Sequence, residues 1–196
     1  LVATSTTMEA TMTSKDPREV RRIIAAGDEN GNAVIYEDKA AADVRTDPAR
    51  PGFAFTRFWV TEDTPAPIKG VRETLHLPNT LQPPTGGSVG SFVTIPPDDW
   101  YMDGLTDEKV SDYFAAMGTP EASRLGDGAP HPYMQQTRSL DYVLVLSGEV
   151  TMVLDTEEVH LGTGDTVVNL GGSHAWSNRS GAPCELFLST HDGKQV

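Results

Sequence analysis

Cysteine is almost absent from this sequence, since Cys184 is the only one in 196 residues. A single thiol cannot form an intramolecular disulfide, so nothing in the sequence indicates a disulfide-stabilised fold or an oxidising compartment. Cys184 begins an apolar run at residues 184–188, where a buried thiol on a strand is the expected role. We therefore interpret the chain as a cytoplasmic protein.

Long apolar runs and basic residues are also scarce. No stretch approaches the ~20 consecutive apolar residues that a membrane helix requires. Only 15 Lys and Arg residues stand against 28 Asp and Glu residues, which gives a formal net charge of −13. Because this charge repels phosphate groups and anionic lipid headgroups, we expect neither a nucleic acid nor a membrane as a partner. A small organic molecule is the expected partner instead.

The length is that of one domain with one hydrophobic core. Residues 1–11 are rich in Thr and poor in apolar side chains, and we interpret them as a disordered or tag-derived tail. Residues 12–196 are then predicted to form a single domain.

Short apolar segments separated by turn residues fill most of this domain. Residues 20–36 hold an Asn-Gly turn between two apolar runs, which predicts a β-hairpin, whereas the Pro-containing segment 43–52 is expected to be a connecting loop. Further strands are predicted at residues 53–60, 88–95, 140–146, 150–154, 165–170, 174–177 and 185–189. Many short strands with a turn about every 8–12 residues are typical of a β-sandwich or barrel.

One segment has helical period. Four apolar residues between Val110 and Met117 recur at the spacing of an amphipathic helix, with Thr106 placed to cap its start and Gly118 its end. We expect this short helix to pack against the outside of a sheet. The predicted fold class is therefore all-β with one short helix.

Polar residues gather at one end of a predicted strand face. Because side chains alternate between faces with period two, Gln135, Thr137 and Asp141 share a face with Val143 and Val145. A face that grades from polar to apolar predicts a barrel with a hydrated mouth and a packed base.

A second group follows the glycines at 171 and 172, where missing side chains allow a ligand or a strand to approach. By the same period, His174, Trp176 and Asn178 are expected to point together. Trp176 is then predicted to line the same pocket as His174.

These two groups resemble the motifs of the cupin superfamily, within residues 132–190. The second cupin motif is matched by Gly171, His174 and Asn178 after a Gly-Asp turn at 164–165. In the first motif, Asp141 occupies the glutamate position, seven residues before the terminal Gly148. Gln135 and Thr137 stand where that motif has its two histidines.

The resemblance implies a cupin double-stranded β-helix, a jelly-roll barrel, here with extra N-terminal strands and one short helix. It also implies a homodimer in which barrels pair through N-terminal strands, and the hairpin at 20–36 is the candidate for that pairing.

The metal site that the resemblance implies contains three imidazoles and one carboxylate. Here the corresponding ligands would be Gln135, Asp141 and His174, which form a weak site for a divalent ion. Both a single divalent metal ion and no cofactor therefore remain open. His131 is a nearby spare imidazole, but Pro132 follows it and leaves its register undefined, so we do not expect it to be a ligand.

Without a metal, Asp141 and His174 would face one another across the pocket as a catalytic pair for proton transfer. The expected function is a lyase, dehydratase or isomerase that acts on a small, apolar carbonyl or hydroxyl compound. Gln135, Thr137 and Trp176 would bind the substrate. The alternatives are a metal-dependent cupin oxygenase, a non-catalytic small-molecule-binding cupin, and a structural hydrogen bond between Asp141 and His174.

Overall fold

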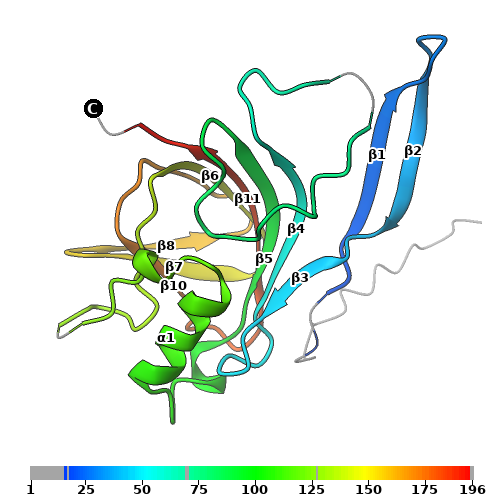
Figure 1. The fold of residues 1–196 in the computed structure, drawn as a ribbon. Helices are drawn as coiled ribbons and strands as arrows, with labels where there is room; N and C mark the ends of the chain where they lie inside the picture. Colours follow the sequence, from blue (N-terminus) through cyan, green and yellow to red (C-terminus); the bar gives the residue numbers. More distant parts are fainter. Residues whose placement is uncertain (1–15, 17, 69–70, 127, 195–196) are drawn as a thin grey trace, which may run out of the picture.

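A computed structural model describes residues 16, 18–68, 71–126 and 128–194, so the tail predicted at 1–11 lies outside the described residues (Figure 1). The described strands pair antiparallel throughout and form a six-stranded sheet, a three-stranded sheet and a two-stranded hairpin. The strands are β1 (Arg21–Gly27), β2 (Ala33–Ala40), β3 (Asp43–Thr46), β4 (Ala54–Thr61), β5 (Ser88–Ile95), β6 (Ser139–Ser147), β7 (Glu149–Leu154), β8 (Glu158–Gly162), β9 (Thr166–Asn169), β10 (His174–Ser177) and β11 (Cys184–Asp192).

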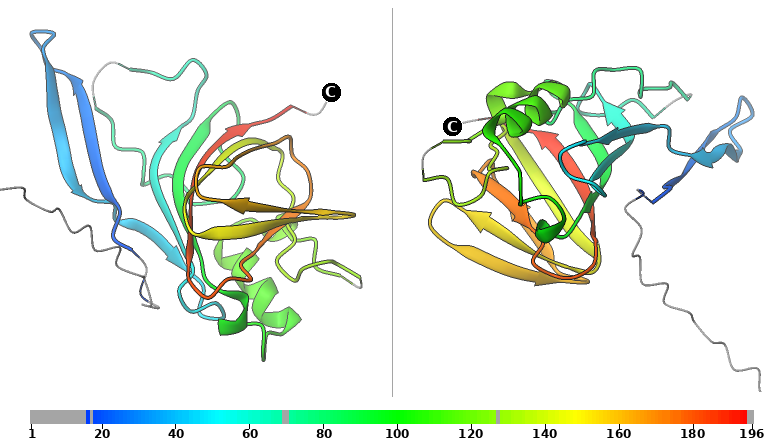
Figure 2. Two further views of the ribbon diagram at one scale, coloured as in Figure 1. Left: turned by 180° about the vertical axis from the view of Figure 1, so that it is seen from behind. Right: turned by 90° about the horizontal axis from the view of Figure 1, so that it is seen from below.

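The large sheet has the order β3-β4-β5-β11-β6-β9 and the small sheet the order β10-β7-β8. The two sheets lie against one another with the hydrophobic core between them (Figure 2). This is a jelly-roll arrangement, which confirms the predicted fold class. Among the described residues, however, the strands do not join into one continuously hydrogen-bonded barrel.

Strand β6 shows why the sequence folds this way. Its side chains alternate, with Val143 and Val145 buried in the core and Tyr142 exposed on the other side. The neighbouring strand β11 places Leu186 beside Val145 and Leu188 beside Val143. The apolar faces of adjacent strands therefore coincide and exclude water from one side of the sheet.

The helix α1 (Asp107–Ala116) begins where the sequence predicts it. The hydroxyl of Thr106 accepts a hydrogen bond from the backbone N–H of Lys109, and Gly118 follows the helix with a φ of +65°. Its buried side chains, which include Phe114, join the core, and Tyr113 packs edge-on against Phe53 just before β4. The helix therefore helps to close one end of the fold (Figure 1).

Two sequence-based assignments need correction. Residues 43–52 are not only a loop, because Asp43–Thr46 form β3 and pair with β4 at the edge of the large sheet. Most of β3 is exposed, so it lacks the apolar alternation by which strands are recognised. In addition, β6 starts at Ser139, so Gln135 and Thr137 precede the strand, and Gln135 instead forms isolated bridges with Ser123 and His174.

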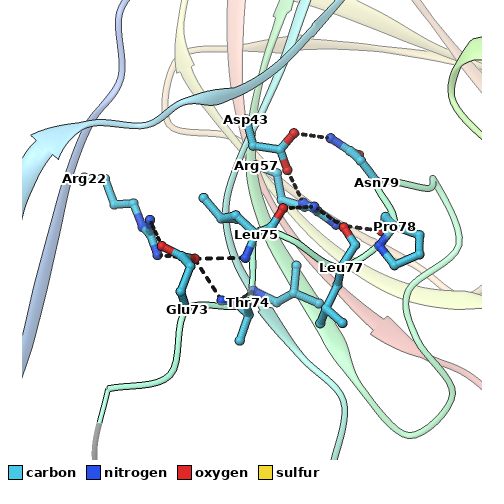
Figure 3. A network of polar contacts seen from close by, with 10 residues as sticks. Arg22, Asp43, Arg57, Glu73, Thr74, Leu75, Leu77, Pro78 and Asn79 are labelled. Carbon is cyan, nitrogen blue, oxygen red and sulfur yellow. Dashed lines mark hydrogen bonds and ion pairs between the residues drawn. The ribbon is translucent and has the colours of Figure 1, made fainter.

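Arg57 of β4 fixes the long connection between β4 and β5 (Figure 3). Its buried guanidinium donates to Asp43 over 2.6 Å, and Asn79 donates to the same carboxylate over 3.0 Å. It also donates to three backbone carbonyl oxygens of the connection, at Leu75, Leu77 and Pro78. The next residues, Thr80 and Leu81, are thereby positioned on the wall of the central cavity.

The hairpin of β1 and β2 projects beside the two packed sheets (Figures 1 and 2). Its buried Arg22 lies over the ring of Trp59 on β4 and pairs with Glu73 (Figure 3). Several of its apolar side chains are exposed, including Ile23, Ile35 and Tyr36. Within the described part of the chain, no helix is long and apolar enough to cross a membrane.

Candidate functional site

A cavity with a volume of about 70 Å³ lies between the two sheets. It is lined by all five residues that the sequence analysis assigned to a pocket, which are Gln135, Thr137, Asp141, His174 and Trp176. Its apolar wall includes Leu81, Val93 and Leu188. The structure therefore brings residues of both cupin-like motifs to one partly enclosed space.

His174 begins β10, and its ring is fixed in one orientation. Its Nδ1 lies 2.9 Å from the carbonyl oxygen of Gly172, which can only accept a hydrogen bond, so Nδ1 carries the proton. The Nε2 atom then has a free electron pair and lies 3.3 Å from the amide nitrogen of Gln135. Two backbone hydrogen bonds between Gln135 and His174 hold the residues in this register.

Burial lowers the pKa of His174, while its hydrogen bond to Gly172 and the charge of Asp141 act in the opposite direction. The net effect is a neutral imidazole at neutral pH. A neutral ring with an unprotonated Nε2 atom can accept a proton.

Asp141 is a buried carboxylate on β6, and the side chain of Asn169 holds it. Asn169 lies opposite Asp141 on β9, and its amide nitrogen is 3.3 Å from Asp141 Oδ2 and 3.2 Å from His174 Nδ1. Its amide oxygen accepts a hydrogen bond from the backbone N–H of Gly172. Asn169 thus bonds to the carboxylate and to the turn before β10, and it lies beside the imidazole without a hydrogen bond to the protonated Nδ1 atom.

The sequence analysis did not single out Asn169. A signal existed, because Asn169 has the same strand parity as Val167 and so faces inward at the polar end of β9.

Two of the other site residues are positioned by direct contacts. The hydroxyl of Thr137 lies 2.8 Å from that of Ser139, and the ring of Trp176 packs edge-on against His174 with 5.8 Å between centroids. Asn178 is different, because it is fully buried and donates to the backbone oxygens of Ile95 and Ala182. The expectation that it points with His174 is wrong, since β10 ends at Ser177 and the alternation ends with it.

Arg50 also lines the cavity, although the sequence analysis placed it in a loop. It is 5% exposed and its Nε atom donates to Asp47 over 2.9 Å. The centres of the rings of Phe53, Tyr113 and Tyr133 lie 3.9, 4.3 and 3.7 Å from its guanidinium carbon. Burial acts to lower the pKa of Arg50, but Tyr113, Tyr133 and Asp47 together raise it, so the group remains charged.

The cavity does not suit a tightly bound transition metal. It offers one imidazole, one carboxylate and the amide of Gln135, and the positive charge of Arg50 in the same wall opposes a dication. In the described ranges, no group of three His, Cys, Asp or Glu side chains is placed to hold a metal ion. His131 is buried outside this cavity, where its Nδ1 accepts a hydrogen bond from the backbone of Tyr133.

Comparison with known families gives a match to the cupin domain over residues 124–190. Residues 124–190 of this chain therefore form a cupin domain. The matched segment contains Gln135, Thr137, Asp141, His174 and Trp176, so the cupin domain supplies both the carboxylate and the imidazole of the cavity. Arg50 comes from outside the matched segment.

The chain is also similar to two curated proteins of Diaporthe leptostromiformis, the phomopsin biosynthesis cluster proteins C′ and D. Each is 48% identical over 48 residues, which is 24% of this chain and 25% of the relative. The similarity thus spans a quarter of the length of these relatives.

Similar solved structures include a cupin 2 conserved barrel domain protein from Salinispora arenicola, with 14% identity and a TM-score of 0.41. That match covers 82% of this chain and 91% of the other. The cupin domain of Cnp3 from Schizosaccharomyces pombe has 7% identity and a TM-score of 0.42, and the match covers 89% of both chains.

Proposed function

We propose that this cupin is an enzyme that transfers a proton on a small organic molecule bearing a carbonyl or hydroxyl group. The reaction class would be that of a lyase, dehydratase or isomerase. One observation carries the proposal: Asp141 of the large sheet and His174 of the small sheet both line one cavity, and Asn169 lies next to both. Two titratable groups in a shared, partly enclosed space are suited to proton abstraction and return.

His174 would act as the base. Its Nδ1–H group is bonded to the carbonyl of Gly172, so Nε2 would take a proton from a carbon atom next to the substrate carbonyl. The neighbouring carboxylate of Asp141 would stabilise the imidazolium that forms. Return of that proton to a different carbon gives an isomerase, and its transfer to a leaving hydroxyl gives a dehydratase.

The remaining wall residues would orient the substrate. The Gln135 amide that faces His174 Nε2 could donate to the substrate oxygen once the substrate lies between them. The Thr137 hydroxyl would bind the same polar group, and the Trp176 ring would contact the apolar part.

The test is a screen of small carbonyl and hydroxy compounds in D₂O, in which NMR detects deuterium uptake or product formation. We expect Asp141→Asn and His174→Ala each to lower the rate at least about 100-fold, the range of general acid–base effects. Matched controls are Asp155→Asn and His160→Ala, an acid and an imidazole that are both exposed and lie outside the cavity. The controls should retain the wild-type rate.

Full activity in either Asp141→Asn or His174→Ala would remove this mechanism, provided that circular dichroism shows an intact fold. A compound that binds in the cavity and is recovered unchanged, with no deuterium uptake, would instead favour a small-molecule-binding cupin.

A further inference from the structure

We infer that Arg50 is a binding residue for a carboxylate group, so that the ligand of this cavity is a small organic acid. The inference deepens the proposed function and rests on the same cavity. The positive charge of Arg50 on the cavity wall indicates an anionic substrate. Arg50 lies outside the segment that matches the cupin domain.

The guanidinium of Arg50 has unused hydrogen-bonding capacity. It carries five N–H donors, yet its one ion pair, with Asp47, uses the Nε atom. Its Nη2 atom is buried and has no hydrogen-bond partner among the described residues. A buried donor without a partner destabilises the fold by about 1–3 kcal/mol. Because Arg50 lines the cavity, we infer that a ligand in the cavity supplies this partner after a small movement of the side chain.

The surroundings leave only part of this planar group for a ligand. The centres of the Phe53, Tyr113 and Tyr133 rings lie 3.9, 4.3 and 3.7 Å from the guanidinium carbon, and Asp47 occupies the Nε edge. Tyr113 also interacts with the guanidinium through its side chain, so Nη2 is the donor that is left for a ligand. A guanidinium held between aromatic rings keeps its orientation, so little conformational entropy is lost when an anion binds.

The charge of Arg50 is only partly neutralised within the protein. Asp47 also accepts hydrogen bonds from the hydroxyl of Tyr133 over 3.0 Å and from the backbone N–H of Ala49 over 2.9 Å. The carboxylate is therefore shared among three donors. A bound carboxylate would supply the missing negative charge through two parallel N–H···O bonds, the geometry that arginine favours.

The size of the cavity limits the acid. Its volume of about 70 Å³ is roughly half of the ~150 Å³ that accommodates benzene in an engineered cavity. On this comparison the cavity is too small for an acid with an aromatic ring, so a short-chain aliphatic acid is the better match. Its carbon atoms would share the cavity with Asp141 and His174 while its carboxylate binds Arg50.

The test compares two probes of the same shape and different charge, isobutyrate and isobutyramide, titrated into the full chain and followed by NMR. We expect wild-type protein to bind isobutyrate at least about tenfold more tightly, since a hydrogen bond to a charged group contributes about 1.5–3 kcal/mol. Equal affinities for the two probes, or no binding of isobutyrate at millimolar concentration, would overturn the inference.

Substitutions at Arg50 test whether this residue causes the preference for isobutyrate. Arg50→Met combined with Asp47→Asn removes both buried charges, and we expect it to abolish the preference for isobutyrate. Arg50→Lys, which keeps the charge without the planar fork, should weaken isobutyrate binding about tenfold if the contact is bidentate. It also provides a variant should the double replacement fail to fold. A preference that persists unchanged in these variants contradicts the assignment.

Binding measurements on Asp141→Asn and His174→Ala test this inference separately from the proposed catalytic function. If Arg50 binds the carboxylate, both variants still prefer isobutyrate over isobutyramide, whether or not they turn over any compound. Loss of turnover without loss of this preference separates the chemistry from the binding.

Discussion

His131 is a buried imidazole close to the central cavity but outside its lining. Its pKa is lowered to about 4, first because burial disfavours the charged ring and then because Arg50 and Arg179 repel a proton, although Asp98 attracts one. Its Nδ1 accepts a hydrogen bond from the backbone of Tyr133, so the neutral ring carries its proton on Nε2. This Nε2 atom is buried without a partner among the described residues.

The lowered pKa predicts loss of stability in mild acid. In the unfolded chain His131 titrates near pH 6.5. Between pH 6.5 and about 4, the imidazole is therefore protonated in the unfolded state and neutral in the folded state. The stabilisation is complete above about pH 6.5 and is lost as the pH falls toward 4. We expect the free energy of unfolding to fall by about 2–3 kcal/mol from this group, and urea denaturation at pH 7 and about 4.5 measures it.

A matched comparison isolates the contribution of His131. The variant His131→Gln should lose less stability between the two pH values than the wild type does, whereas His160→Gln, at an exposed site, should behave like the wild type. Identical pH dependence in all three proteins would contradict the assignment.

Sequence analysis could predict some residues of the cavity wall but not others. Asp141 and His174 lie on the cavity wall as strand alternation and the cupin resemblance predict, because both are local properties of the chain. Gln135 also lines the cavity, but it precedes β6, so strand alternation does not explain its position. Arg50 could not be found in this way. Its burial depends on rings from Phe53, Tyr113 and Tyr133, which are brought together only by the tertiary fold.

At the scale of elements, strand alternation and turn residues predicted most of the sheet. They failed where the physical signal is weak. Strand β3 is short and mostly exposed, and β8 likewise begins with the exposed residue Glu158, which pairs with Arg179. Edge strands of this kind are defined by their hydrogen bonds to a neighbour rather than by buried side chains.

The turn between β6 and β7 depends on a glycine. Gly148 has a φ of +77°, and a Cβ atom added there would lie 2.9 Å from the carbonyl oxygen of Pro183 and 3.1 Å from the Cα of Cys184. We expect Gly148→Ala to lower the free energy of unfolding by about 1–3 kcal/mol, because strain and a backbone clash act together. Urea denaturation would measure this loss.

Gly164→Ala is the matched control for that experiment. Gly164 has a φ of +94°, and an added Cβ atom would meet nothing within 4 Å. It should therefore show the effect of backbone strain alone and lose less stability than Gly148→Ala. Equal losses would mean that the approach of Pro183 to the turn has no energetic effect.

On the scale of the whole molecule, the hairpin of β1 and β2 is the least supported part of the fold. A two-stranded hairpin alone is at best marginally stable in water. Ile23, Ile35 and Tyr36 are 51%, 64% and 64% exposed on this hairpin, which projects beside the packed sheets (Figure 1). We propose that a second copy of the chain covers it, so that the protein is a homodimer.

Light scattering coupled to size-exclusion chromatography tests this proposal at micromolar concentration. We expect a dimer for the wild type and a monomer for Ile35→Glu combined with Tyr36→Glu, since a charge in an apolar interface opposes association. Val168→Glu is the control, because Val168 is a similarly exposed apolar residue on β9, away from the hairpin. A monomeric wild type would refute the pairing.

Arg57 has a consequence for how this protein could diversify. It recognises only main-chain oxygen atoms at positions 75, 77 and 78, and every amino acid provides such an atom. Substitutions at these three positions can therefore accumulate without moving the anchor points of the connection. Thr80 and Leu81 should therefore keep their positions on the cavity wall when residues 75, 77 and 78 are substituted.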